Sequence, residues 1–405
     1  MSADHRDRVD GLEPPSPSDL LKLAETLFEP FVEDLRTLVD IECGTFLPGG
    51  VNRVADHMQA RFEAAGWTTS RTPHRPGPGE EQLGDVLVAT LRGSVPAADG
   101  GRRVLLVGHM DTVFPDGTAA ARPFHTEGDR GLGPGVSDMK GGLLGGFYAV
   151  RALQEAGFDG FDAITYVCNP DEEIGSPFSG PAILERAGEA DVCFVLEGAR
   201  ENGDIVSARK GVADILITVH GRAAHAGVEP HKGRSATLQA AHTTIALHEL
   251  NGRWPGVTVN VGVIQGGTRP NVVAQDCVLR VDVRATQAAA FQAALEEVER
   301  VARLVVVPDV TVDFEIGSGF PPMEKTPSTA RLASRAVGIA AELGFDLADA
   351  ATGGASDANP VAGMGVPVLD GLGPVGGDDH APTEWVDLSS VPPRVALLAS
   401  LIATG

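Results

Sequence analysis

Several acidic side chains and one histidine stand directly after short apolar runs in the first half of the chain. These residues are His109, Asp111, Glu172, Glu173 and Glu197. Carboxylates that gather at one place repel each other unless they are protonated or bound to cations. One histidine with several carboxylates suits a borderline divalent metal such as Zn²⁺, with Co²⁺ or Mn²⁺ as substitutes. The pattern therefore predicts a metal site that needs no cysteine ligands.

A glycine-rich segment, 131–142, places a further carboxylate, Asp138, just before a predicted helix. The segment lacks both G-x-x-x-x-G-K-[ST] and G-x-G-x-x-G, which argues against a nucleotide site. The sequence also lacks a G-x-S-x-G nucleophile elbow, which argues against a serine hydrolase. These absences leave metal chemistry as the favoured interpretation.

The elements that must position these groups alternate between strand and helix. Apolar runs at 103–107, 163–168 and 191–196 predict buried strands, and helices are expected at 139–156 and 180–188. This alternation is typical of a parallel or mixed sheet covered by helices on both faces. Because ligand sites in such sheets lie at the carboxyl ends of the strands, the acidic groups should meet at one edge.

The rest of the chain predicts a second, smaller domain. A polar leader of about 18 residues precedes a helical pattern over Leu20–Ile41, which Pro30 should kink or divide. The middle of the chain has the order β-α-β-β-α-β, which is the ferredoxin-like unit. Its elements are expected at 213–219, 235–250, 257–263, 277–283, 288–304 and 310–314. We therefore expect a larger α/β domain over 1–208 and 321–405, interrupted by a smaller domain over 209–320.

The composition limits the partners. The 405 residues include 32 Lys and Arg against 55 Asp and Glu, a formal charge of −23. So acidic a surface repels phosphate backbones and anionic lipids, so neither nucleic acid nor a membrane is expected as a partner. The four scattered cysteines, without a C-x-x-C pair, are typical of a reducing compartment. Without an apolar N-terminal signal or a run of about 18–20 apolar residues, the sequence predicts a soluble cytoplasmic protein.

Over about Leu20 to Ala403, the chain resembles the M20 family of metallopeptidases, most closely its glutamate carboxypeptidase-like group. The motifs that carry the resemblance are GHMDTV, GPGVSDMKGG, NPDEEIGS, LEG, GRAAHAG, DVRA, GGASDAN and DDHAPTEWVD. The resemblance implies a zinc-peptidase-like catalytic domain interrupted by a ferredoxin-like lid, through which two chains form a homodimer. It also implies two Zn²⁺ ions per chain and hydrolysis of an amide bond in a small peptide or N-acyl amino acid.

The same resemblance implies a set of metal ligands. His109 and Glu197 match the ligands of one zinc ion. Glu173 and His380 match those of the other, and Asp138 matches the carboxylate that bridges both. The five residues would thus supply the ligands of a two-metal site, with one of them shared.

Five further residues match functional positions of the family. Glu172 resembles the general base that takes a proton from the attacking water, and Asp111 would orient the first histidine ligand from behind it. His225 resembles the lid histidine that reaches a neighbouring subunit's active site and stabilises the reacting oxyanion. Asn271 and Arg284 lie where the family's lid contacts the substrate's carboxylate.

Three functions stay open at this point. The first is a metallocarboxypeptidase, the second an N-acyl amino acid deacylase of the acetylornithine or succinyl-diaminopimelate type, and the third a metal-free scaffold. The intact Glu172 and ligand set argue against the scaffold. Glu197 fits the first two functions, because relatives that act as aminopeptidases or dipeptidases tend to have Asp there. Phe320 stands where glutamate-cleaving relatives carry a basic residue, which argues against a preference for C-terminal glutamate.

Overall fold

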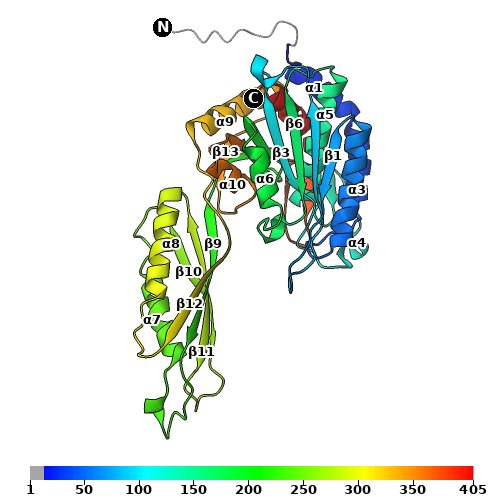
Figure 1. Cartoon of the computed structure of the whole chain (residues 1–405). Coiled ribbons are helices and arrows are strands. Elements are labelled where there is room, and N and C mark those ends of the chain that lie inside the picture. Colours follow the sequence, from blue (N-terminus) through cyan, green and yellow to red (C-terminus); the bar gives the residue numbers. More distant parts are fainter. Residues whose placement is uncertain (1–12, 405) are drawn as a thin grey trace, which may run out of the picture. The chain divides into compact units, whose positions relative to one another are not determined.

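The structure is a computed structural model that describes residues 13–404 and divides the chain into two compact units (Figure 1). The first unit comprises Met1–Ser207, Lys325–Ala351 and Met364–Gly405, and the second comprises Ala208–Glu324 and Thr352–Gly363. The predicted leader falls largely on residues 1–12, outside the described part of the chain. The short segment 352–363, expected in the larger domain, groups with the second unit. The division into a catalytic and a lid domain stays a prediction.

The first unit is built on a six-stranded sheet in the order β1-β2-β6-β3-β7-β14. In that order its strands span Thr68–Thr72, Val86–Arg92, Ala163–Asn169, Arg103–His109, Val192–Val195 and Val368–Leu369. β3 pairs in parallel with β6 and β7, and β14 with β7, whereas β1 and β2 run antiparallel to their neighbours. The prediction of a parallel or mixed sheet is therefore confirmed. β1 was not predicted, because its sequence, Thr-Thr-Ser-Arg-Thr, has no apolar alternation.

Helices surround this sheet, and α5 and α6 both contact β3. The helices of this unit are α1 (Pro17–Thr26), α2 (Phe28–Val39), α3 (Pro48–Ala64), α4 (Thr118–Ala121), α5 (Gly141–Glu155), α6 (Gly180–Ala187), α9 (Pro327–Leu343) and α11 (Val391–Thr404). The helix expected over Leu20–Ile41 is divided at Leu27, as predicted. The division follows from Pro30, whose ring would clash with the carbonyl of Thr26 in a continuous helix.

A second four-stranded sheet, in the order β15-β16-β5-β4, ties two loops of the first unit together. Its strands are β15 (Gly376–Gly377), β16 (Trp385–Asp387), β5 (Arg130–Leu132) and β4 (His125–Glu127). Because β5 leads into the glycine-rich segment and β15 and β16 flank residues 378–384, the two loops are held side by side. β8 (Ile205–Arg209) and β13 (Asp349–Thr352) form a separate two-stranded sheet. Strands this short carry no readable period, and none of them was predicted.

The second unit has the predicted β-α-β-β-α-β order. Its elements are β9 (Gly211–His220), α7 (Ala236–His248), β10 (Thr258–Gly266), β11 (Asp276–Ala285), α8 (Ala288–Ala302) and β12 (Thr311–Phe320), followed later by α10 (Ala358–Gly363). The strands form one antiparallel sheet in the order β10-β11-β9-β12, with β10 and β12 at its edges. Both helices pack on one face of this sheet (Figure 1). Accordingly, Ala213 and Ile215 of β9 are buried, while Asp214 between them points to the opposite face and is exposed.

Within residues 13–404, no helix is both long and apolar enough to cross a membrane.

A buried carboxylate joins three helices of the first unit. Asp34 of α2 accepts hydrogen bonds from His57 Nε2 (3.1 Å) and Tyr148 Oη (2.7 Å), and it forms an ion pair with Arg61. His57 and Arg61 lie on α3, and Tyr148 lies on α5. Burial alone would raise the pKa of Asp34, but these three partners outweigh it and lower the pKa. The ionised carboxylate therefore stabilises the fold at neutral pH, and this contribution is lost as the pH falls through the lowered pKa.

Replacing Asp34 by Ala should lower the free energy of unfolding by about 1–3 kcal/mol, because the substitution leaves the buried hydroxyl of Tyr148 without its acceptor, whereas the 47% exposed side chain of Arg61 stays solvated. Asp56 of α3 is the matched control: its side chain is 66% exposed and pairs with Arg71, so Asp56→Ala should change stability by less than about 1 kcal/mol. Denaturant unfolding at pH 7 measures both. Equal effects of the two substitutions would contradict the role of Asp34.

Candidate active site

His109 is the last residue of β3, and its side chain is completely buried. Its Nδ1 donates a hydrogen bond to the carbonyl oxygen of Asp111 at 3.0 Å, so Nε2 is the atom that faces the acidic groups. Nε2 lies 2.9 Å from Oδ1 of Asp138 and 3.8 Å from Oε1 of Glu197. Glu197 follows the end of β7, which is the parallel neighbour of β3. The parallel pairing therefore delivers both side chains to one edge of the sheet.

The two carboxylate oxygens of Asp138 face two different histidines. Oδ1 faces His109, and Oδ2 lies 3.0 Å from Nε2 of His380. The same nitrogen of His380 lies 3.3 Å from Oε2 of Glu173. Asp138 is thus central, and each histidine has a second carboxylate beside it, Glu197 in one case and Glu173 in the other.

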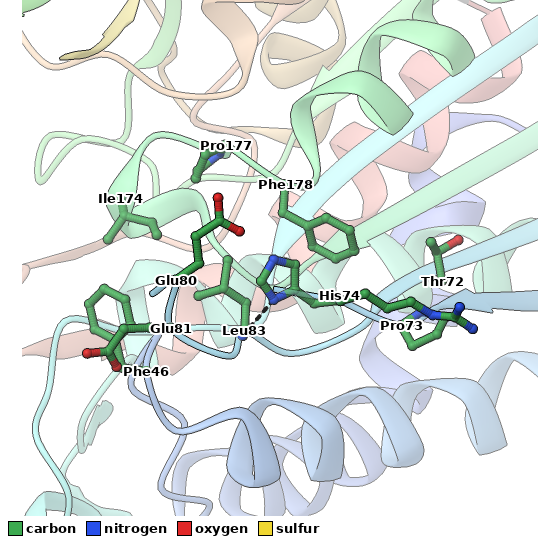
Figure 2. A pocket seen from close by; sticks show the side chains of 11 residues that line it. Phe46, Thr72, Pro73, His74, Glu80, Glu81, Leu83, Ile174, Pro177 and Phe178 are labelled. Carbon is green, nitrogen blue, oxygen red and sulfur yellow. Dashed lines mark hydrogen bonds between the residues drawn. The ribbon is translucent and has the colours of Figure 1, made fainter. Parts of the chain in front are cut away.

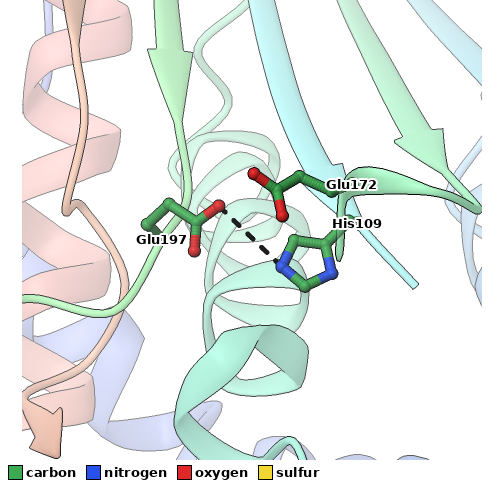
Figure 3. Close-up of side chains that lie close together, drawn as sticks. All are labelled: His109, Glu172 and Glu197. Atoms are coloured by element: carbon green, nitrogen blue, oxygen red, sulfur yellow. Dashed lines mark ion pairs between the residues drawn. The ribbon is translucent and has the colours of Figure 1, made fainter. Parts of the chain in front are cut away.

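Glu172 belongs to the same cluster. It opens the short 3-10 turn Glu172–Ile174 that follows β6. Possible ligand atoms of His109, Glu172 and Glu197, drawn in Figure 3, lie within 4.8 Å of one another. Those of His109, Asp138 and Glu173 do so as well. Since Glu172 is close enough to act as a ligand, its role as a general base stays a prediction.

Asp111 supports the cluster from behind. Its buried carboxylate accepts a hydrogen bond from Thr45 Oγ1 at 2.7 Å. It also accepts the backbone N–H groups of Glu172 at 3.2 Å and Glu173 at 3.4 Å. The contact with His109 runs through the carbonyl oxygen as well as through the side chain, whose Oδ1 lies 3.4 Å from Nδ1. Asp111 therefore links the end of β3 to the loop after β6.

Glu384 is a site residue that the sequence did not reveal. Its buried carboxylate accepts the backbone N–H groups of Gly135 (2.9 Å), Ser137 (2.8 Å) and Asp138 (3.0 Å). This anchors the loop that carries the central carboxylate to the segment that carries His380. The only signal in the sequence was the place of Glu384 in the DDHAPTEWVD motif, four residues after that histidine.

Two glycines allow the backbone to come this close. Gly135 has φ +73°, and a Cβ on it would lie 2.6 Å from Cγ2 of Thr112. A Cβ on Gly142, at the start of α5, would lie 1.7 Å from the carbonyl oxygen of Leu196, the residue before Glu197. Any larger side chain would displace the loop of Asp138 or the end of β7.

The titration of the cluster reflects how closely its charges are packed. Burial disfavours the ionised form of Asp138, but hydrogen bonds to His109 and His380 outweigh it and lower the pKa of Asp138. Burial likewise opposes the protonation of His109, yet Asp111 and Asp138 raise its pKa. Asp138 and then Glu173 raise the pKa of His380 to about 10, while burial raises the pKa of Glu173. The ionised carboxylates of the cluster therefore need positive charge beside them, supplied either by protonated histidines or by bound metal ions.

The donor set fits a divalent metal. Imidazole nitrogens and carboxylate oxygens are ligands that zinc accepts, and cobalt and manganese bind to similar sets. Oε1 of Glu173 is buried and has no hydrogen-bond partner among the described residues. A buried carboxylate oxygen without a partner is costly unless a cation satisfies it. The cluster is therefore suited to hold metal ions.

The remaining predicted residues lie in the second unit. His225 forms an isolated bridge with Val272, and its Nδ1 accepts the backbone N–H of Gly227 at 3.2 Å. Asn271 is next to it, since the N–H of Ala226 donates to the carbonyl oxygen of Asn271 at 3.0 Å. The structure thus brings His225 and Asn271 together, on segments that continue β9 and β11 beyond the sheet.

Arg284 lies at the other end of β11. The strand starts at Asp276, so eight residues at about 3.4 Å each place Arg284 roughly 27 Å along it. Its Nε donates to Asp282 at 3.1 Å and its Nη1 to the carbonyl oxygen of Gly353 at 2.7 Å. Within the second unit of one chain, Arg284 is therefore far from Asn271.

Residues 105–404 match the model of peptidase family M20/M25/M40. The chain belongs to this family. It is therefore a hydrolytic enzyme of a metal-dependent family, as the resemblance of its motifs implied.

Similar proteins agree with the assignment to family M20. Carboxypeptidase G2 of Pseudomonas sp. (strain RS-16) is 30% identical over 92% of the chain and 88% of its own length. Acetylornithine deacetylase of Myxococcus xanthus is 30% identical over 62% of the chain and 65% of its own length. The crystal structure of aminopeptidase PepT from Bacillus cereus has a TM-score of 0.73 at 23% identity, covering 93% of this chain and 98% of that one. The structural match supports the M20 fold.

Replacing Glu384 by Gln should weaken metal binding by about 10–100-fold, because the amide cannot accept all three backbone N–H groups that hold the Asp138 loop. Competition with a chelator measures the dissociation constant. Glu189→Gln is the control, since the Glu189 side chain is 65% exposed and lies on the surface. An unchanged metal affinity in Glu384→Gln would show that the loop needs no such anchor.

Proposed function

We propose that this chain is a dinuclear zinc hydrolase that cleaves the amide bond next to an amino acid with a free carboxylate. The observation that carries the proposal is the central position of Asp138, whose two oxygens each face a histidine at 2.9–3.0 Å. Each histidine has its own carboxylate neighbour, so the cluster resolves into two half-sites that share one bridge. A site for a single metal ion would need only one of these two half-sites, so the arrangement favours two ions.

The proposed ligands are His109 and Glu197 for one ion, Glu173 and His380 for the other, and Asp138 for both. When bound, two such ions polarise the scissile carbonyl and make water more acidic. Glu172 takes the proton of the attacking water and passes it to the leaving nitrogen, as general base and then general acid. Glu172 is suited to this because its backbone is held by Asp111 while its side chain lies at the cluster.

The carboxypeptidase-type reaction is favoured by the relationship to carboxypeptidase G2, which extends over 92% of the chain. The alternative is an N-acyl amino acid deacylase, because acetylornithine deacetylase is also a relative, over 62% of the chain. Both reactions break an amide bond beside a free α-carboxylate, so the same cluster serves either one. The two functions differ in the acyl group of the substrate, so the substrates that the enzyme hydrolyses distinguish them.

Elemental analysis after loading with zinc should find two metal ions per chain. Asp138→Ala should lose both, because the bridge belongs to both half-sites. Glu172→Gln should keep both and lower kcat by about 10²–10⁴-fold, since an amide cannot accept the water's proton. One tightly bound ion in the wild type, or wild-type kcat in Glu172→Gln, would contradict the proposed roles.

A homodimer is part of the proposal. His225 and Asn271 lie beyond the start of β11, whereas Arg284 lies roughly 27 Å away near its end. One small substrate cannot contact both groups of a single second unit. Two chains resolve this, if Arg284 anchors the α-carboxylate in its own subunit and His225 and Asn271 serve the partner's active centre. The edge strand β10 and the exposed Leu238 and Ile245 of α7 offer a surface for pairing.

Co-expression of His225→Ala with Glu172→Gln tests this sharing of residues. Each variant alone should be nearly inactive. At equal expression about half of the dimers should be mixed. In each mixed dimer, one of the two centres combines an intact Glu172 with an intact His225 from the partner, so about one quarter of wild-type activity should return. If His225 acts within its own chain, no centre is complete and no activity returns. An active monomer by light scattering would exclude the dimer itself.

Phe320 should steer the side-chain preference. It is the last residue of β12 and pairs with Val212, and an aromatic ring cannot pair with a substrate carboxylate. The wild type should therefore prefer N-acyl-leucine or N-acyl-phenylalanine to N-acyl-glutamate, and Phe320→Arg should shift kcat/KM towards glutamate by about tenfold or more. If the wild type prefers glutamate by about tenfold, the interpretation is wrong, and Arg269 is the first candidate to bind the acidic side chain.

A further inference from the structure

A cavity of about 770 Å³ lies in the first unit, and part of its lining comes from the turn that carries Glu172 and Glu173. Figure 2 shows its apolar and aromatic lining, which includes Phe46, His74, Leu83, Ile174, Pro177 and Phe178. Its volume is within the range of about 300–1,000 Å³ that is common for small-molecule sites. Its lining includes none of the proposed metal ligands or lid residues, so the proposed chemistry leaves it without a role.

One peptide bond and one hydrogen bond connect residues that line this cavity to the acidic cluster. Ile174 directly follows Glu173 in the turn Glu172–Ile174. Phe46 directly follows Thr45, whose hydroxyl donates to Asp111 at 2.7 Å. The cavity therefore begins one residue away from a proposed metal ligand.

Hydrogen bonds and a ring contact hold one part of the cavity lining in place, while another part is exposed. The rings of His74 and Phe178 lie 4.6 Å apart, and Nδ1 of His74 accepts the N–H of Leu83 at 3.0 Å. The N–H of Phe178 donates to Asp171 at 2.7 Å, which fixes the loop after the turn. Phe46, by contrast, is 52% exposed. An exposed aromatic ring in an otherwise apolar lining is suited to bind a flat apolar group.

The charges around the cavity favour some acyl groups over others. Glu80 and Glu81 line it together with one cation, Arg75. The excess of negative charge disfavours an acidic acyl group such as succinyl. An acetyl group, with one methyl, would leave the apolar wall in contact with water. An aromatic or bulky apolar acyl group matches both the size and the lining.

We propose that this cavity is the acyl-group subsite and that it selects substrates with an aromatic or bulky apolar group on the scissile carbonyl. The inference rests on the proposed function, in which the second unit binds the amino-acid carboxylate and so leaves the acyl side to the first unit. It favours the carboxypeptidase-type reaction over removal of acetyl or succinyl groups.

The test compares kcat/KM of the zinc-loaded enzyme for N-benzoyl-, N-acetyl- and N-succinyl-leucine. The benzoyl substrate should exceed the acetyl one by about 10–100-fold, as expected for burying one phenyl ring. Phe46→Ala should lower the benzoyl-to-acetyl ratio by about tenfold, whereas Val337→Ala, an exposed apolar residue on α9, should leave the ratio unchanged. Glu81→Lys should raise the succinyl-to-acetyl ratio. A wild-type ratio near one, or a ratio that Phe46→Ala does not change, would overturn the proposal.

A binding measurement separates this inference from the proposed function. Calorimetry on zinc-loaded Glu172→Gln should give a dissociation constant for N-benzoyl-leucine about tenfold below that for N-acetyl-leucine, and the double variant with Phe46→Ala should lose the difference. If no N-acyl amino acid is hydrolysed but this preference is found, the proposed function fails and the subsite stands. If all three substrates are hydrolysed equally and bind equally, the subsite fails and the proposed function stands.

Discussion

The mutual repulsion of four carboxylates at one edge of a sheet is the constraint on which this structure depends. Asp138, Glu172, Glu173 and Glu197 converge around His109 within a few ångströms. In a partly buried place such a group stays ionised only where positive charge balances it. Asp138 meets this need through two histidines, whose Nε2 atoms lie 2.9 and 3.0 Å from its carboxylate oxygens. The neighbouring backbone must then hold these groups against their own repulsion.

Two buried carboxylates outside the cluster, Asp111 and Glu384, hold the backbone that carries the cluster residues. Asp111 holds the turn after β6 through two N–H groups, and Glu384 holds the glycine-rich loop through three. Both acceptors are buried, where a hydrogen bond is stronger than at the surface. The close approach at Gly135 and Gly142 completes the arrangement. The cluster is thus supported from both sides by main-chain contacts.

The sequence predicted the long elements well and the short ones poorly. Continuous apolar runs identified the central strands of the main sheet, the β-α-β-β-α-β order identified the ferredoxin-like unit, and Pro30 marked the division between α1 and α2. β5, β15 and β16 have two or three residues each, too few for any period to show, although they bring the loops of Asp138 and His380 together. Similarly, the motifs pointed to the residues of the cluster, but Glu384 could not be recognised because its partners are backbone N–H groups more than 240 positions away.

The length of β11 has a consequence for how the second unit can vary. If the residues at its two ends serve different active centres, the length of the strand fixes the distance between those residues. Inserting one residue would turn the side chains beyond it to the opposite face, and inserting two would lengthen the strand by about 7 Å. Loops such as the one between α8 and β12 are free of this requirement. Insertions and deletions in related chains should therefore be rare within β11 and common in those loops.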